Sequence, residues 1–299
     1  MATTPPLPLI AVDVGNARTK LGLFRAVAMG TGLPKPERTL RLDNETPLPA
    51  RLGRWVAEIA AEHPERRTQR VPGPAAKRTS PAAKRTSPAA KQTSPAAKRV
   101  RWHIASVNRA AATRLVDWLR EHRGGDPLVL LAAADLPLQV RLPRPDMVGV
   151  DRLLDAVAAN RLRQAGRAAV VVDVGSAITV DLVSAEGEFM GGAILPGIAM
   201  SARAMYEFTD LLPQIDVSEL RKPPPALGTA TEPAMRAGLF WGAVGGIRQL
   251  VEQLTHNKEP QVFLTGGAGP VVARLLGRSS RYVPHLTLAG IALAADWGP

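Results

Sequence analysis

Residues 12–19 read VDVGNART and residues 172–179 read VDVGSAIT, so six of the eight positions are identical. In both places an apolar run ends in an aspartate and a glycine, and a second strand-like run follows. A match of this length in the same context, about half a chain apart, indicates an internal duplication. The chain is therefore expected to contain two halves with the same local design.

Each copy has the chemistry of a phosphate-binding turn. An aspartate at the end of a strand can hold a hydrated cation, and the following glycine permits a tight reversal that leaves backbone N–H groups open to a phosphate. Asn16 and Ser176 come next and can donate to a phosphate oxygen. One such turn alone is usually an ordinary hairpin. Two that face each other across a cleft would clamp a nucleoside triphosphate and its metal.

The rest of the chain alternates strands with helices. Strands are predicted over 9–14, 20–25, 100–105, 128–133, 169–174, 177–184, 188–193 and 261–265. Helices are predicted over 48–61, 109–122, 149–164, 200–212, 231–253, 268–276 and 286–295. A glycine-rich turn over 264–269 lies between a strand and a helix, a position suited to nucleotide contact. This order predicts an α/β fold with mixed sheets, divided into domains at 1–140 and 141–299.

The net charge of +12 comes largely from one segment. Residues 74–99 repeat PAAKRTS and hold seven basic residues and no acid, which leaves +5 for the rest of the chain. A proline in every unit breaks a helix, and the scarcity of large apolar residues predicts disorder. Residues 64–99 are therefore interpreted as a disordered insertion without a function of its own. Contact with nucleic acid through this insertion is the less favoured alternative.

Composition excludes several classes of protein. The sequence has no cysteine, which rules out disulfides and thiolate catalysis, and its five histidines show no metal-binding spacing. The first residues lack the pattern of a signal peptide, and no run of 18 apolar residues occurs. A cytoplasmic protein without a membrane partner is expected.

The two aspartate–glycine hairpins and the late Thr-Gly-Gly turn resemble the actin, sugar kinase and acetate kinase superfamily. Six motifs, in order along the chain, resemble the type III pantothenate kinases. They are VDVGNARTKLGLF at 12–24, VGVDR at 148–152, DVGSAITVD at 173–181, GGAILPG at 191–197, TEPAMRAG at 231–238 and LTLAGI at 286–291. The resemblance implies two duplicated actin/ribonuclease-H-like domains, with mixed sheets flanked by helices and ATP in the cleft between them.

The resemblance also implies an activity. That family transfers the γ-phosphate of ATP to the primary hydroxyl of pantothenate, which gives 4'-phosphopantothenate in the first step of coenzyme A biosynthesis. It acts as a homodimer and uses Mg²⁺ or another divalent cation together with K⁺ or NH₄⁺.

Site residues carry over from the motifs in the same way. Asp151 is the implied general base, Asp13 the ligand of the divalent metal with ATP, and Asp173 the ligand of the monovalent cation. The implied ATP-binding residues are Asp13, Val14, Gly15, Asn16, Ala17, Arg18, Thr19, Lys20 and Ser176. The implied pantothenate-binding residues are Leu142, Gly149, Val150, Asp151, Arg152 and Thr231, the last from the partner subunit or nearby.

Elementary chemistry agrees with the role of Asp151. Asp151 and Arg152 open a predicted helix, where N–H dipoles and a guanidinium suit an anionic substrate such as pantothenate. An ionised carboxylate beside a hydroxyl can accept its proton during phosphoryl transfer. The residue types alone also allow an ordinary helix-terminal aspartate paired with Arg152.

Three positions depart from the family pattern. Ala17 stands where Ser or Thr is usual, a loss that Arg18 and Thr19 could offset, and Ser176 replaces Thr. Leu142 stands where a tyrosine is often found, which keeps a second kinase interpretation open, with another hydroxyl substrate. A non-catalytic, transcription-related regulator on the same fold is the remaining alternative.

Overall fold

The computed structural model describes residues 7–25, 32–45, 49–61, 99–217, 222–256, 260–277 and 279–297. The predicted insertion over 64–99 lies outside the described residues up to residue 98.

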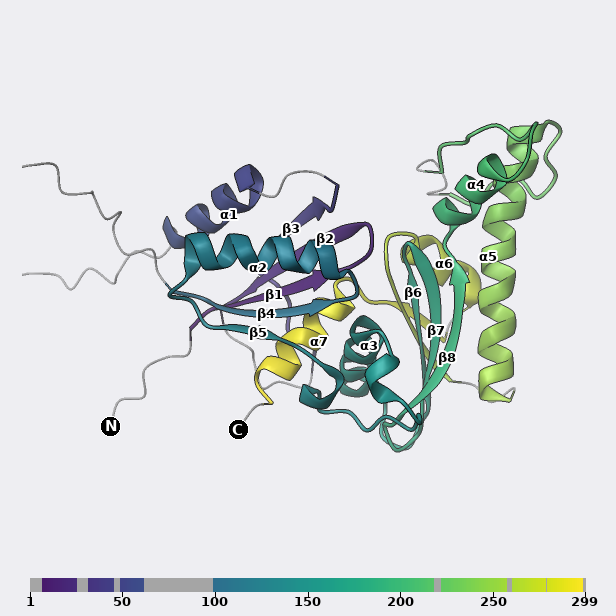
Figure 1. Ribbon diagram of the computed structural model, residues 1–299. Coiled ribbons are helices and arrows are strands. Elements are labelled where there is room, and N and C mark those ends of the chain that lie inside the picture. The colour runs from purple at the N-terminus through teal and green to yellow at the C-terminus, as the bar shows by residue number, and fades with distance from the viewer. Residues whose placement is uncertain are drawn as a thin grey trace, which may run out of the picture.

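Two five-stranded sheets form the framework, and they have the same topology (Figure 1). The first consists of β1 (Leu9–Val14), β2 (Arg18–Phe24), β3 (Arg38–Asp43), β4 (Arg101–Ser106) and β5 (Leu128–Leu130) in the order β3-β2-β1-β4-β5. The second consists of β6 (Ala169–Val174), β7 (Ala177–Val183), β8 (Phe189–Pro196), β9 (Gln261–Thr265) and β10 (Ser280–Tyr282) in the order β8-β7-β6-β9-β10. In each sheet the first three strands run antiparallel and the last two parallel to the first. The mixed sheets and the duplication are confirmed.

Helices cover both faces of the sheets. They are α1 (Pro49–Ala61), α2 (Arg109–Arg123), α3 (Val150–Leu162), α4 (Ile198–Glu207), α5 (Thr231–Thr255), α6 (Gly269–Leu276) and α7 (Leu286–Ala295). Figure 1 shows α1 and α2 outside the first sheet, α5 and α6 outside the second, and α3 with α7 between the two sheets. Among the described residues, none of these helices is long and apolar enough to cross a bilayer.

Side-chain alternation explains this layering. In β1, Ile10 and Val12 pack with α1 and α2, whereas Leu9 and Ala11 belong to the core around α3 and α7. In β6, even-numbered residues pack with α5 and α6, and the odd-numbered ones join the same central core. Asp13 and Asp173 occupy the next odd positions at the two strand ends. Both aspartates therefore face the central layer.

The central layer depends on a close approach between its two helices. A Cβ added at Gly290 in α7 would overlap the carbonyl oxygen of Leu154 in α3. Helix α7 is buried along almost its whole length, and Leu288 lies against Gly22 of the first sheet. The last helix of the chain thus covers the sheet that is built from its first residues.

Four element predictions differ from the structure. Strands β3 and β10 were not predicted, because β3 reads RTLRLD with few apolar positions and β10 is only three residues long. The strand predicted over 128–133 ends at Leu130. The helix predicted over 200–212 is α4, which begins directly after Gly197 and ends at Glu207.

Candidate active site

The first loop joins β1 to β2 and brings a lysine to its aspartate. Asp13 is buried and pairs with Lys20 across the hairpin, where Lys20 Nζ lies 3.0 Å from Asp13 Oδ2. The second loop is one residue tighter, so that Asp173 pairs with Thr179 and has no lysine opposite. This difference is invisible in the aligned motifs, which match residue for residue.

Electrostatics place the two aspartates around one lysine. Burial lowers the pKa of Lys20, but the charges of Asp13, Asp173 and Asp155 and the hydrogen bond to Asp13 together raise it by more, so that it lies above its ordinary value. The pKa of Asp173 is raised, mainly by burial and further by Asp13, although Lys20 opposes the shift. Because each group acts on the others, the three side chains lie near one another between the two loops, and we call this region the cleft.

Asp151 enters this cleft from the start of α3. Its Oδ1 accepts a hydrogen bond of 2.8 Å from the Arg152 amide, and a Cβ at Gly149 would come within 2.6 Å of the same oxygen. The glycine therefore leaves room for the carboxylate at the helix end. Burial, followed by the charge of Asp13, raises the pKa of Asp151 above its ordinary value.

The Arg152 guanidinium is already engaged by the protein. Its Nε lies 3.1 Å from both carboxylate oxygens of Asp181 in β7, Nη2 contacts the same carboxylate, and its Cζ lies 5.7 Å from the centre of the Phe189 ring. The Arg152 side chain is 15% exposed. A substrate carboxylate that meets Arg152 would share it with Asp181.

Asp155 is a site residue that the sequence interpretation missed. It lies one turn beyond Asp151 on the same face of α3, close enough to Asp173 for the two carboxylates to repel each other. Burial, followed by the charge of Asp173, raises its pKa well above the ordinary value, against a hydrogen bond from Thr287 of α7. The signal available in the sequence is an aspartate four residues after Asp151 in an otherwise apolar helical run, VDRLLDAVAA.

Acidic groups outnumber basic groups in this cleft. The described residues that interact there are the carboxylates Asp13, Asp151, Asp155, Asp173 and Asp181, and the cations Lys20 and Arg152. Asp155 Oδ1 and Asp173 Oδ1 are buried without a hydrogen-bond partner in the described structure. Such oxygens fit a hard cation.

The described residues do not form a closed protein cage for a cation. They contain no group of three or more His, Cys, Asp or Glu side chains that could hold a metal ion. A cation bound here would therefore complete its coordination with backbone, water or phosphate oxygens, as ions that accompany ATP do.

The late glycine turn completes one wall of the cleft. Gly266 has a φ of 86°, and a Cβ there would overlap Asp173 Oδ1, so this turn packs directly on the second aspartate. Beside it, burial, Arg41 and Lys20 lower the pKa of His285 at the start of α7. Arg41 belongs to β3, the polar edge strand that was not predicted.

The remaining residues expected at ATP divide into two groups. Asn16, Ala17 and Ser176 are exposed at the loop tips. Val14 and Thr19 are buried, the Thr19 hydroxyl donates to Asn44 Oδ1 at 2.7 Å, and Arg18 pairs with Asp43 at 3.2 Å. The hydroxyl of Thr19 and the guanidinium of Arg18 are thus engaged by protein groups.

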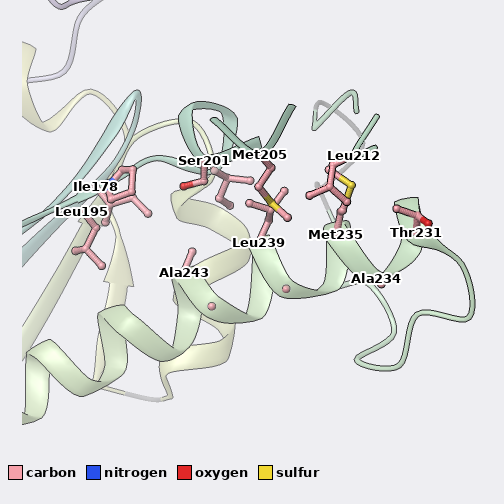
Figure 2. Close-up of a pocket in the computed structure, with 14 residues that line it drawn as sticks. Ile178, Leu195, Ser201, Met205, Leu212, Thr231, Ala234, Met235, Leu239 and Ala243 are labelled. Carbon is pink, nitrogen blue, oxygen red and sulfur yellow. The ribbon is translucent and has the colours of Figure 1, made fainter. Parts of the chain in front are cut away.

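Two residues expected to bind pantothenate, Leu142 and Thr231, do not lie at the start of α3 with the others. Leu142 packs near Gly191 of β8. Thr231 begins α5 and lines a cavity of about 550 Å³ between α4, α5 and the ends of β7 and β8. Figure 2 shows Thr231 at one end of this cavity and Ile178 at the other. The cavity wall contains no aspartate, so the structure does not place Thr231 among the carboxylates of the cleft.

Apolar side chains are exposed around the same cavity. Phe208 and Leu211 follow α4, Leu227 precedes α5, and these three side chains are 83%, 91% and 80% exposed. Met200 and Tyr206 of α4 are also exposed. We call these five residues the α4–α5 apolar patch.

Comparison with known proteins gives a family. A family model described as type III pantothenate kinase matches residues 56–253. The type III pantothenate kinase of Agathobacter rectalis is 36% identical over 56% of this chain and 64% of its own length. That of Dehalococcoides mccartyi is 28% identical over 95% of this chain and 96% of its own length. The crystal structure of glucokinase from an Antarctic psychrotroph superimposes over 96% of this chain and 98% of its own, with a TM-score of 0.47 at 12% identity.

The matched segment of the family model covers more than half of the chain and includes α3, both strands that flank the second loop, and most of α5. The chain therefore belongs to the type III pantothenate kinase family.

Proposed function

We propose that this protein transfers the γ-phosphate of ATP to the primary hydroxyl of pantothenate, with Asp151 as the general base. The observation that carries the proposal is the position of Asp151. It is a half-buried carboxylate with a raised pKa in the cleft that Asp13, Asp173 and Lys20 share. Family membership supplies the substrate, and the cleft supplies groups suited to phosphoryl transfer.

The two loops have separate tasks in this proposal. The backbone amides at the tip of the first loop bind ATP phosphates, and Lys20 brings positive charge to the same point. Asp13 would hold the divalent metal, Asp173 the monovalent cation and Ser176 a phosphate oxygen. Bound there, the cations would supply positive charge for the phosphates next to a cleft that is itself rich in carboxylates.

Asp151 then acts on the acceptor alcohol. Its raised pKa makes it a stronger base than an exposed aspartate. The Arg152 amide and the space above Gly149 fix the carboxylate at the end of α3. Positioning and charge neutralisation supply most of the rate, and proton transfer to Asp151 a smaller share.

The direct test is pantothenate-dependent formation of ADP from ATP with Mg²⁺ and K⁺. Asp151→Asn should lower kcat by about 100-fold or more and keep nucleotide affinity, because only the proton acceptor is lost. Asp117→Asn, at an exposed aspartate of α2, is the matched control. Normal turnover by Asp151→Asn would reject the base. Turnover with other polyols but not pantothenate would favour the second kinase hypothesis.

We also propose that two copies of the chain associate through the α4–α5 apolar patch. Large exposed apolar side chains on neighbouring elements are typical of an interaction surface. A second copy would cover them and could bring its own Thr231 to this chain's pantothenate site. A Phe208→Asp, Leu211→Asp double variant should sediment as a monomer. A dimer that persists unchanged in this variant would reject the surface. The cytoplasmic location stays a prediction from the sequence.

A further inference from the structure

We propose that Asn44, just after β3, is a positioning residue that orients the first phosphate loop and thereby sets the affinity for ATP. The inference rests on the proposed function, since it takes the tip of this loop to bind ATP phosphates. Asn44 belongs to none of the motifs quoted above.

Asn44 holds three consecutive carbonyl groups of the loop. Its Nδ2 donates to the carbonyl oxygens of Gly15 at 2.7 Å and Asn16 at 3.1 Å. Its backbone N–H donates to the carbonyl oxygen of Ala17 at 3.0 Å. Its Oδ1 accepts the hydroxyl of Thr19 at 2.7 Å. One residue outside the hairpin therefore contacts Gly15, Asn16, Ala17 and Thr19.

Because each peptide group is planar, these contacts also fix the direction of the N–H groups of Asn16 and Ala17. The C=O and N–H groups of a trans peptide point to opposite sides. When the carbonyls of Gly15 and Asn16 point at Asn44, the N–H groups of Asn16 and Ala17 must point away from it. In the described structure neither of these two N–H groups donates a hydrogen bond. Two unpaired amides held side by side are a binding site for phosphate oxygens.

Asn44 is itself fixed. Its carbonyl oxygen accepts a hydrogen bond of 2.9 Å from Arg114 Nη2 of α2. Asn108 gives partial support, because its Nδ2 also donates to Asn16 O at 3.1 Å, but its Oδ1 caps α2. Asn44 is therefore the residue whose loss frees most of the loop with the least effect on a helix.

The second loop is held in another way. The Ser176 carbonyl, which follows the glycine as Asn16 does, accepts a hydrogen bond of 3.1 Å from the backbone N–H of Gly197. A Cβ at Gly197 would overlap that carbonyl. The second loop is thus fixed by backbone, whereas the first depends on the side chains of Asn44 and, to a smaller extent, Asn108.

The test compares Asn44→Ala with Asn160→Ala. Asn160 is a matched control, because its Nδ2 donates to the carbonyl of Gly187 in the β7–β8 turn at 2.6 Å, away from the phosphate loops. For Asn44→Ala we expect the Kd of a non-hydrolysable ATP analogue and the KM for ATP to rise about tenfold. The KM for pantothenate should change less than twofold. Asn160→Ala should lower Tm about as much as Asn44→Ala does, and it should leave the KM for ATP unchanged.

A second variant guards against a folding defect. Asn44→Asp keeps the size of the side chain and the acceptor for Thr19, but it cannot donate to the two loop carbonyls. It should therefore lose ATP affinity while it retains the wild-type Tm within a few degrees. If neither Asn44 variant weakens ATP binding, the inference is overturned.

A further pair of variants separates this failure from failure of the proposed function. Asp13→Asn and Lys20→Ala should each weaken ATP binding if the first loop binds phosphate. If they do and the Asn44 variants do not, only the role of Asn44 is wrong. If none of the four variants changes ATP affinity, the phosphate-binding role of the first loop is wrong as well.

Discussion

Asp151 shows how one position acquires its chemistry from its surroundings. Burial and the charge of Asp13 disfavour its ionised form, and the Arg152 amide partly restores it. As a result, the Asp151 carboxylate is a better proton acceptor than an aspartate carboxylate in water. The same balance sets the pH at which the enzyme should stop working.

The pH profile of the rate follows from that shift. Because the base must be ionised, kcat should fall as the pH drops through the raised pKa of Asp151, at a higher pH than an ordinary aspartate would give. The expected log kcat profile has an acid limb of unit slope and a plateau above it, measured in buffers of constant ionic strength. A rate that stays constant down to pH 4 would contradict the assignment.

At the same scale, the motifs identified most of the cleft and missed particular partners. They located Asp13, Lys20, Asp151 and Asp173, because strand ends and turns leave local signals. They could not reveal that Arg152 is paired with Asp181, since that contact joins residues 29 positions apart. Nor could they reveal the one-residue difference between the hairpins, which depends on strand register.

At the scale of elements, the contact between α3 and α7 fixes the site. Asp151 and Asp155 lie on α3, and Thr287, which bonds to Asp155, lies on α7. The absence of a side chain at Gly290 allows the two helices to approach closely. Any change that separates them moves the carboxylates of the cleft.

Gly290→Ala should therefore be strongly destabilising. The added methyl would overlap the Leu154 carbonyl, and such overpacking typically costs about 1–3 kcal/mol of unfolding free energy. Gly245→Ala in α5 is the control, because nothing lies within 4 Å of a Cβ there, and it should raise stability by about 0.5–1 kcal/mol. Denaturant titrations of both variants measure the difference, and equal stability of the two would refute the close packing.

The element predictions succeeded where a strand or helix has a strong apolar pattern. They failed for the edge strands β3 and β10 and for the ends of some elements. Strands β1 and β6 lie inside sheets and read as apolar runs that end in Asp-Val. Strand β3 is an edge strand whose side chains alternate between leucine and charged or polar groups. Its position is fixed by pairing with β2 and not by its own composition, so single-sequence patterns could not place it.

At the scale of the whole molecule, every group assigned to the cleft comes from the described elements. Deletion of residues 74–99 should therefore leave kcat and both KM values within about twofold of the wild type, because no catalytic group is removed. Steady-state kinetics of the deletion variant check this. A collapse of activity would show that the basic repeat takes part in the reaction. Binding of DNA at physiological salt, lost on deletion, would instead support contact with an anionic polymer.

The position of α7 has a consequence for synthesis of the protein. Leu9 and Ala11 are translated long before the helix that packs on their face, which is made only at residues 286–295. At about 5–20 residues per second, the nascent first sheet stays half-uncovered for roughly tens of seconds. A premature stop codon that removed only this helix would leave that apolar face permanently bare, a target for chaperones and proteases although every cleft aspartate had been translated.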